Sequence, residues 1–190
     1  MSISLAKGST LSLKKADGSD LTLVRLGLGW DAKKSGLFGR VKDIDLDASA
    51  ILFDKNKNRV DEVYYGHLTS RDGSIRHSGD NLTGDGDGDD EQIVVNLQLI
   101  PATVESVVLV ITSYSGDSFD TIANVYARVN DVSNGDTEVA RYNLADGGRN
   151  TASIVAKIVR EGSGWKIVAV GNPANGKTVG DVISDAKAVL

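Results

Sequence analysis

The chain of 190 residues contains no cysteine, which excludes disulfide bonds, thiolate metal sites and cysteine nucleophiles. A chain without cysteine suits a reducing compartment. Residues 1–8 contain no apolar run of signal-peptide length. No stretch approaches the roughly eighteen apolar residues that a membrane span requires. We therefore expect a cytoplasmic protein.

Histidine is scarce, and the two that occur, His67 and His77, stand among polar neighbours. We expect them to be surface or packing residues and not metal ligands. The sequence has no Gly-x-Ser-x-Gly elbow, and neither histidine has a context typical of a nucleophile's base. Carboxylates could form a glycosidase pair, but their crowding favours a cation over a sugar ring. The sequence predicts no enzymatic activity.

Basic residues are absent from residues 78–92, where six carboxylates are interspersed with four glycines. Such a segment repels itself unless a cation neutralises it, and calcium takes about six to eight oxygen ligands. A solvated acidic linker is the alternative interpretation. Three observations argue against a linker. The segment lies in mid-chain, its glycines alternate with aspartates, and the apolar strand pattern of residues 93–97 follows directly. The sequence therefore predicts a calcium loop.

This loop does not fit the EF-hand pattern. Asp85, Asp87 and Asp89 match the first three ligand positions, but the sixth position is Asp90 where the pattern requires glycine, and the twelfth is Asn96. Helices are not predicted on either side. A metal ion would therefore need further ligands from other parts of a β scaffold.

A second acidic region alternates with apolar residues. Asp43, Asp45 and Asp47 are predicted to point to one face of a strand, and Ile44 and Leu46 to the other. Ordinary solvent-facing positions are the alternative, although aspartate is depleted in strands. The predicted metal ligands are Asp31, Asp43, Asp45, Asp47, Asp80, Asp85, Asp87, Asp89, Asp90 and Glu91.

These ten carboxylates exceed what one calcium ion can use, so two ions are expected. Removing the ten acids from the formal charge of −5 leaves +5 for the rest of the chain. Outside one concentrated acidic pole, the protein is therefore predicted to be mildly basic. Nucleic acid is a poor partner for that pole.

The remaining sequence indicates an all-β fold. Short alternating segments separated by turn residues predict a single domain over residues 1–190, an antiparallel β-sandwich of about ten strands. Asn134-Gly135 is predicted to form a type I′ hairpin turn. Only residues 179–190 have the apolar spacing of a helix, which predicts a short C-terminal helix.

Two glycine motifs resemble nucleotide-binding loops. Residues 171–178 match the phosphate-loop pattern G-x-x-x-x-G-K-[ST], but only twelve residues follow and the preceding strands are predicted to be antiparallel. A nucleotide or phosphate ligand, held there or bridged by calcium, is the alternative function. Residues 27–32 resemble a dinucleotide-binding fingerprint, but the helix that this motif needs does not follow. Trp30 is predicted to be a core residue or a wall beside Asp31.

The motifs together resemble the TerD family of tellurium-resistance and bacterial stress proteins. The resemblance extends over nearly the whole chain, and the segments that carry it are Ser4-Leu5-Ala6-Lys7-Gly8, Leu26-Gly27-Leu28-Gly29-Trp30-Asp31, residues 43–50, residues 77–91, Glu138-Val139-Ala140-Arg141-Tyr142 and Gly164-Trp165-Lys166. Family members often have glutamate where this chain has Asp85, whose shorter side chain is expected to reach a metal through water.

The resemblance implies a calcium-binding β-sandwich without catalytic activity, associated with tellurite resistance and with defence against phage and colicin. Together with the acidic loop, it predicts a stress-response protein in which calcium orders residues 78–92 to form an interaction surface. The expected partners are calcium itself and, through calcium, another stress-complex protein or an anionic membrane surface.

Overall fold

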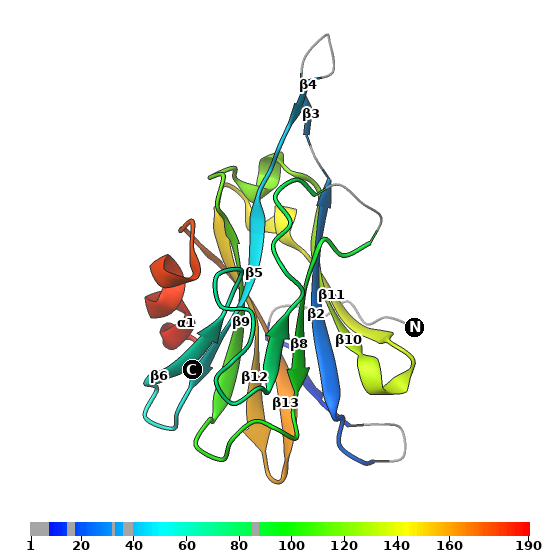
Figure 1. Ribbon diagram of the computed structural model, residues 1–190, viewed down its shortest axis with the longest axis vertical. Coiled ribbons are helices and arrows are strands. Elements are labelled where there is room, and N and C mark those ends of the chain that lie inside the picture. The colour runs from blue at the N-terminus through cyan, green and yellow to red at the C-terminus, as the bar shows by residue number, and fades with distance from the viewer. Residues whose placement is uncertain (1–7, 15–17, 32, 36–39, 85–87) are drawn as a thin grey trace.

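The computed structural model describes residues 8–14, 18–31, 33–35, 40–84 and 88–190, which form two antiparallel β-sheets packed face to face (Figure 1). In order across it, the larger sheet contains β1 (Thr10–Ser12), β13 (Gly164–Ala174), β12 (Ala152–Glu161), β9 (Ser106–Ser113), β5 (Leu46–Phe53) and β6 (Arg59–Val63). The smaller sheet contains β11 (Thr137–Asn143), β10 (Ala123–Asp131), β2 (Leu23–Asp31), β8 (Glu91–Asn96) and β7 (Ile75–His77). The prediction of an antiparallel β-sandwich is confirmed.

Short elements complete the fold. The hairpin of β3 (Lys33–Ser35) and β4 (Arg40–Lys42) projects from one end of the sandwich (Figure 1). Single 3₁₀ turns are η1 (Phe119–Thr121), η2 (Val132–Asn134), η3 (Leu144–Gly147) and η4 (Val179–Val182). The last of these leads into α1 (Ile183–Ala188), so the predicted C-terminal helix is confirmed.

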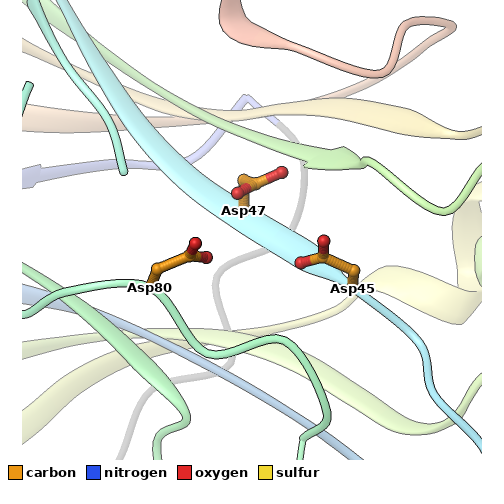
Figure 2. A group of neighbouring side chains, drawn as sticks. All are labelled: Asp45, Asp47 and Asp80. Atoms are coloured by element: carbon orange, nitrogen blue, oxygen red, sulfur yellow. The ribbon is translucent and has the colours of Figure 1, made fainter. Parts of the chain in front are cut away.

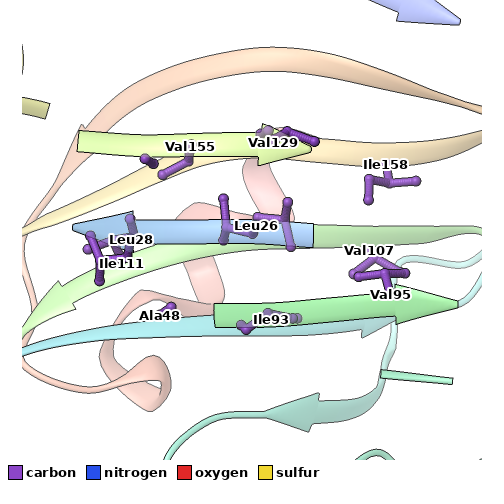
Figure 3. Close-up of a cluster of buried hydrophobic side chains, with 14 of the residues drawn as sticks. Leu26, Leu28, Ala48, Ile93, Val95, Val107, Ile111, Val129, Val155 and Ile158 are labelled. Atoms are coloured by element: carbon purple, nitrogen blue, oxygen red, sulfur yellow. The ribbon is translucent and has the colours of Figure 1, made fainter. Parts of the chain in front are cut away.

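The main core lies between the two sheets. In β8 the residues alternate between buried and half-buried, as expected for a strand with one face against the core. Figure 3 shows Leu26, Ile93 and Val129 of the smaller sheet together with Val107 and Val155 of the larger one. Trp30 belongs to this core, as predicted, and is 2% exposed.

A second apolar layer covers the larger sheet from outside. Ile51, Phe53 and Val108 pack in one cluster with Val182 and Ala186 of the C-terminal helical segment. This cover explains why every residue of β5 and β9 is buried. Asp47, near the start of β5, is also buried, at 2% exposed.

The prediction of a type I′ turn with Asn134 and Gly135 at its centre is wrong. The strands β10 and β11 do pair as a hairpin, but η2 occupies the start of their connection and the positive φ angles are at Gly135 (66°) and Asp136 (59°). The Asp136 carboxylate accepts a hydrogen bond from Arg25 Nη2 at 2.5 Å. Its carbonyl accepts another from Asn130. These contacts hold a non-glycine residue in the left-handed conformation.

Candidate metal site

Three of the predicted ligands meet at the N-terminal end of β5. Asp45 immediately precedes β5, Asp47 belongs to it, and Asp80 lies in the segment between β7 and β8. Each side chain offers a carboxylate oxygen, and these three oxygens lie within 4.8 Å of one another. Figure 2 shows the carboxylates of Asp45 and Asp80 facing each other, with Asp47 beside them. We call these residues the acidic trio.

Among the residues whose side chains the structure describes, no positive charge lowers the pKa of Asp45 or Asp47. Burial, followed by repulsion from the carboxylates of Glu91, Asp45 and Asp80, raises the pKa of Asp47 to about 8. Burial, followed by repulsion from Asp80 and Glu91, raises the pKa of Asp45 to about 6. Asp47 Oδ2 and Asp45 Oδ1 are buried without a hydrogen-bond partner among the described residues. Buried charges are ordinarily paired or bound to a metal, so the trio has the electrostatics of a cation site.

A small pocket opens beside the trio. Its volume is about 160 Å³, and its walls are Asp45, Asp47, Asp80, Tyr65, Leu82 and Tyr114. The rings of Tyr65 and Tyr114 meet edge to face, with centroids 6.1 Å apart. Burial, and then the negative charge of Asp47, raises the pKa of Tyr65, so its hydroxyl is neutral at ordinary pH. The pocket therefore combines carboxylates with neutral aromatic rings.

Glu91 connects the acidic segment to β5. Its carboxylate is fully buried, with Oε2 accepting from Ala48 N at 2.8 Å and Oε1 accepting from Asn81 N at 3.1 Å. The Gly79 N–H donates to His77 Nδ1 at 3.1 Å, so His77 carries its proton on Nε2, which lies 3.1 Å from the Ala48 carbonyl oxygen. Together these contacts hold Asp80 next to β5. The expectation that His77 is a packing residue fits this arrangement.

Asp89 lies on the outer face of the smaller sheet. Its carboxylate accepts from Arg128 Nε at 2.7 Å and from the Tyr126 hydroxyl at 3.3 Å, and Arg25 Nη2 lies 3.9 Å away. A Cβ atom at Gly27 would overlap this carboxylate. The glycine in the dinucleotide-like motif therefore allows the acidic segment to contact β2. The negative charge of Asp89 is compensated by arginine.

Of the other predicted ligands that the structure describes, none belongs to the group of three converging oxygens. Asp90 Oδ2 accepts from Trp30 N at 2.9 Å. Asp31, exposed at the end of β2, accepts from Asn124 Nδ2 at 2.6 Å. Asp43 is exposed ahead of β5. Asp85 and Asp87 lie outside the described residues.

Sequence reasoning missed the aromatic wall of the pocket. Tyr114 reaches the trio because Leu46 pairs with Ser113 in the sheet register and Tyr114 N donates to the Asp45 carbonyl oxygen at 3.0 Å. Tyr65 arrives from the segment after β6. No local sequence pattern predicts that either tyrosine lines the pocket, because both placements depend on which strands are neighbours in the sheet.

The phosphate-loop-like motif has a different structure from that of a phosphate-binding loop. Its first four residues, Gly171 to Ala174, are the end of β13. The backbone N–H groups of Lys177 and Thr178 donate to Asp181 Oδ2 at 2.9 and 3.0 Å. A carboxylate from the same chain thus holds N–H groups that would otherwise be available to a phosphate.

Within the described residues, no helix is long and apolar enough to cross a membrane.

The fold and pocket define an antiparallel β-sandwich with a cluster of acidic residues at the start of β5. The sequence matches the TerD domain over residues 1–185, so the chain belongs to the TerD family. It is 40% identical to the tellurium resistance protein TerZ of Serratia marcescens, over 96% of each chain. It is 41% identical to the stress response protein SCP2 of Bacillus subtilis (strain 168), over 97% of this chain and 98% of that protein.

Solved structures show the same fold. A homologue of telluride resistance protein (TerD) from Streptomyces coelicolor A3(2) superposes with a TM-score of 0.72 at 23% identity. The match covers 87% of this chain and 95% of that one. The expected family and fold are both confirmed.

Proposed function

We propose that this chain is a calcium-binding, non-enzymatic stress-response protein of the tellurium-resistance type. The observation that carries the proposal is the acidic trio, with three converging carboxylates and two buried oxygens that lack hydrogen-bond partners among the described residues. The names of its relatives support a role in resistance or stress response. Those names specify no reaction.

Calcium suits the trio better than magnesium does. The ligands come from two segments of chain, and Asp80 is exposed at the rim whereas Asp47 is buried. Calcium accepts six to eight oxygens in flexible geometry, and magnesium demands an almost ideal octahedron. Asp45, Asp47 and Asp80 would hold the first ion, with backbone oxygens and water completing its shell. A total of two ions is also part of the proposal, and it rests on the number of acids in the sequence, since the structure brings three of the described ones together.

Calcium would act on the segment between β7 and β8. That segment is attached to the larger sheet through Glu91 and to the smaller sheet through Asp89. Neutralising the trio removes the repulsion that pushes Asp80 away from β5. The segment would then present an ordered surface that includes the exposed side chain of Leu82. A stress-complex protein or an anionic membrane is the partner that we propose for this surface.

Calorimetric titration of the metal-free protein tests the proposal. Calcium should bind with measurable heat and raise the melting temperature, and magnesium should do so far less. Asp47→Asn should abolish the high-affinity heat. Glu105→Gln is the matched control, because Glu105 is an exposed acid in the connection between β8 and β9. The absence of both heat and thermal shift at millimolar calcium would disprove the proposal.

A further inference from the structure

The pocket beside the acidic trio has an apolar wall that a metal ion does not require. Leu82 is 56% exposed and Tyr114 is 49% exposed, and both line the pocket with Tyr65. Metal ions bind through oxygen ligands and water, which neither Leu82 nor the ring carbons of the two tyrosines can supply. The wall therefore indicates a ligand with an apolar part as well as a positive charge.

We infer that this pocket also binds a primary alkylammonium group, with the charged nitrogen among the acidic trio and the hydrocarbon chain against the apolar wall. Three acceptors placed around one ammonium nitrogen in tetrahedral directions, each at about 2.8 Å, are about 4.6 Å apart. The three carboxylate oxygens lie within 4.8 Å of one another. This upper limit admits the separation of about 4.6 Å that the three N–H donors of one ammonium group require.

The floor of the pocket favours a hydrogen-bond donor. Asp47 is 2% exposed, and its Oδ2 has no hydrogen-bond partner among the described residues. A buried carboxylate oxygen in this condition is costly, and a charged donor compensates it with a short, strong hydrogen bond. An ammonium group supplies one N–H to each carboxylate of the trio, including this one.

The aromatic rings favour a cationic ligand, and the volume of the pocket limits the length of its hydrocarbon chain. Ammonium groups are attracted to the faces of tyrosine rings, and both Tyr65 and Tyr114 line the pocket. The volume of about 160 Å³ resembles that of a cavity of about 150 Å³ that holds benzene, a molecule with six non-hydrogen atoms. An ammonium group with a chain of four carbons fits this space, with its outer end against Leu82.

The ammonium group and calcium would exclude each other, because they use the same carboxylates. This second part of the inference rests on the proposed function, whereas amine binding by the metal-free protein does not. The amine has two possible sources with the same chemistry, which are a free aliphatic diamine and a lysine side chain of a protein partner.

Titration of the metal-free protein with n-butylammonium, methylammonium and potassium chlorides at constant ionic strength tests the inference. Butylammonium should bind at least tenfold more tightly than methylammonium, since each fully buried methylene contributes a factor of about four. Saturating calcium should abolish amine binding. Leu82→Ser and Tyr114→Ser alter exposed side chains, so both should fold, weaken butylammonium severalfold and leave calcium affinity unchanged.

Two further probes distinguish the sources. If Nα-acetyl-lysine N-methylamide binds within about threefold of butylammonium, the pocket accepts a lysine side chain of a partner. If it binds at least tenfold more weakly while 1,4-diaminobutane binds well, the ligand is a free amine. Either result supports an ammonium site.

The inference is overturned if butylammonium binds no better than methylammonium or potassium, or if Asp47→Asn leaves its affinity unchanged. If the protein binds calcium, amine binding that persists at saturating calcium also overturns it. If butylammonium does not bind but calcium binds normally, the ammonium site is disproved and the proposed function is unaffected. Amine binding without any calcium binding removes the proposed function and preserves the ammonium site.

Discussion

The carboxylate of Glu91 accepts a hydrogen bond from the backbone N–H of Ala48, a residue 43 positions earlier in the chain. Its other oxygen accepts from Asn81 N. One fully buried side chain thereby connects the strand that carries Asp47 with the segment that carries Asp80. This contact holds the two halves of the acidic trio together before any metal binds.

Glu91→Gln should destabilise the metal-free protein and weaken calcium binding. An amide has only one acceptor oxygen, so its NH₂ group must face either Ala48 N–H or Asn81 N–H. A buried donor left unsatisfied costs about 1–3 kcal/mol. Urea unfolding in calcium-free buffer measures this loss, and Glu105→Gln should leave stability unchanged. Equal stability of the two variants would contradict the role assigned to Glu91.

Gly27→Ala should destabilise the protein through its contact with Asp89. The new methyl group would overlap the buried carboxylate that pairs with Arg128, and clashes of this kind cost about 1–3 kcal/mol. A double-mutant cycle with Asp89→Ala isolates the pair. The glycine substitution should cost less in the Asp89→Ala background. Equal costs in both backgrounds would show that β2 itself, and not Asp89, requires the glycine.

Two calcium ions should bind, and Asp45→Ala should weaken both. Asp45 belongs to the acidic trio and lies between Asp43 and Asp47 in the alternating segment, so we expect it to be a shared ligand. Asp31→Ala should change affinity by less than about threefold, because Asp31 instead binds Asn124. Calorimetric stoichiometry checks the first expectation. A value of one would confine the site to the acidic trio.

The metal-free protein should lose stability as pH rises. The folded-state pKa of Asp47 is about 8 and that of Asp45 about 6, both above the ordinary value of 3.8. Between about pH 4 and about pH 8 the folded state therefore binds more protons than the unfolded state, so the free energy of unfolding decreases with pH. Urea unfolding across this range should show the slope, and Asp47→Asn should flatten it. The same groups must release protons to bind calcium, so calcium affinity should increase with pH.

Lys177→Ala should leave calcium binding and stability unchanged, and ATP should not bind at micromolar concentrations. Asp181→Ala should cost about 1 kcal/mol, because Asp181 and Thr178 form a reciprocal cap at the start of the C-terminal helical segment. Thermal unfolding and nucleotide titration measure these effects. Micromolar ATP affinity that disappears in Lys177→Ala would restore the phosphate-loop interpretation.

The strands and the convergence of Asp45 and Asp47 on one face of β5 followed from local patterns. Alternation of Asp45 and Asp47 with Leu46 correctly predicts that the carboxylates and the core lie on opposite faces, because side-chain direction in a strand has a period of two. The apolar spacing of residues 179–190 likewise predicts the C-terminal helix. Both inferences use only neighbouring residues.

The sequence did not predict which partner each acidic side chain contacts. Asp80, Asp89 and Glu91 belong to one acidic segment, yet Asp80 joins the trio, Asp89 pairs with Arg128, and Glu91 binds the backbone of β5. These partners are distant in sequence and become neighbours only through the order of strands in each sheet. The type of turn at Asn134-Gly135 was missed for a related reason, since Arg25 of another strand stabilises Asp136.

The edge-to-face pair of Tyr65 and Tyr114 places two phenol rings where they can sensitise light emission from a lanthanide ion bound in the pocket. Terbium shares calcium's preference for oxygen ligands and emits visible light when a nearby phenol ring passes excitation energy to it. An ion held by Asp45, Asp47 and Asp80 would lie in the pocket that both rings line. Occupancy of the pocket can therefore be followed by emission from the native chain, without an attached dye, while calcium or an amine displaces the lanthanide.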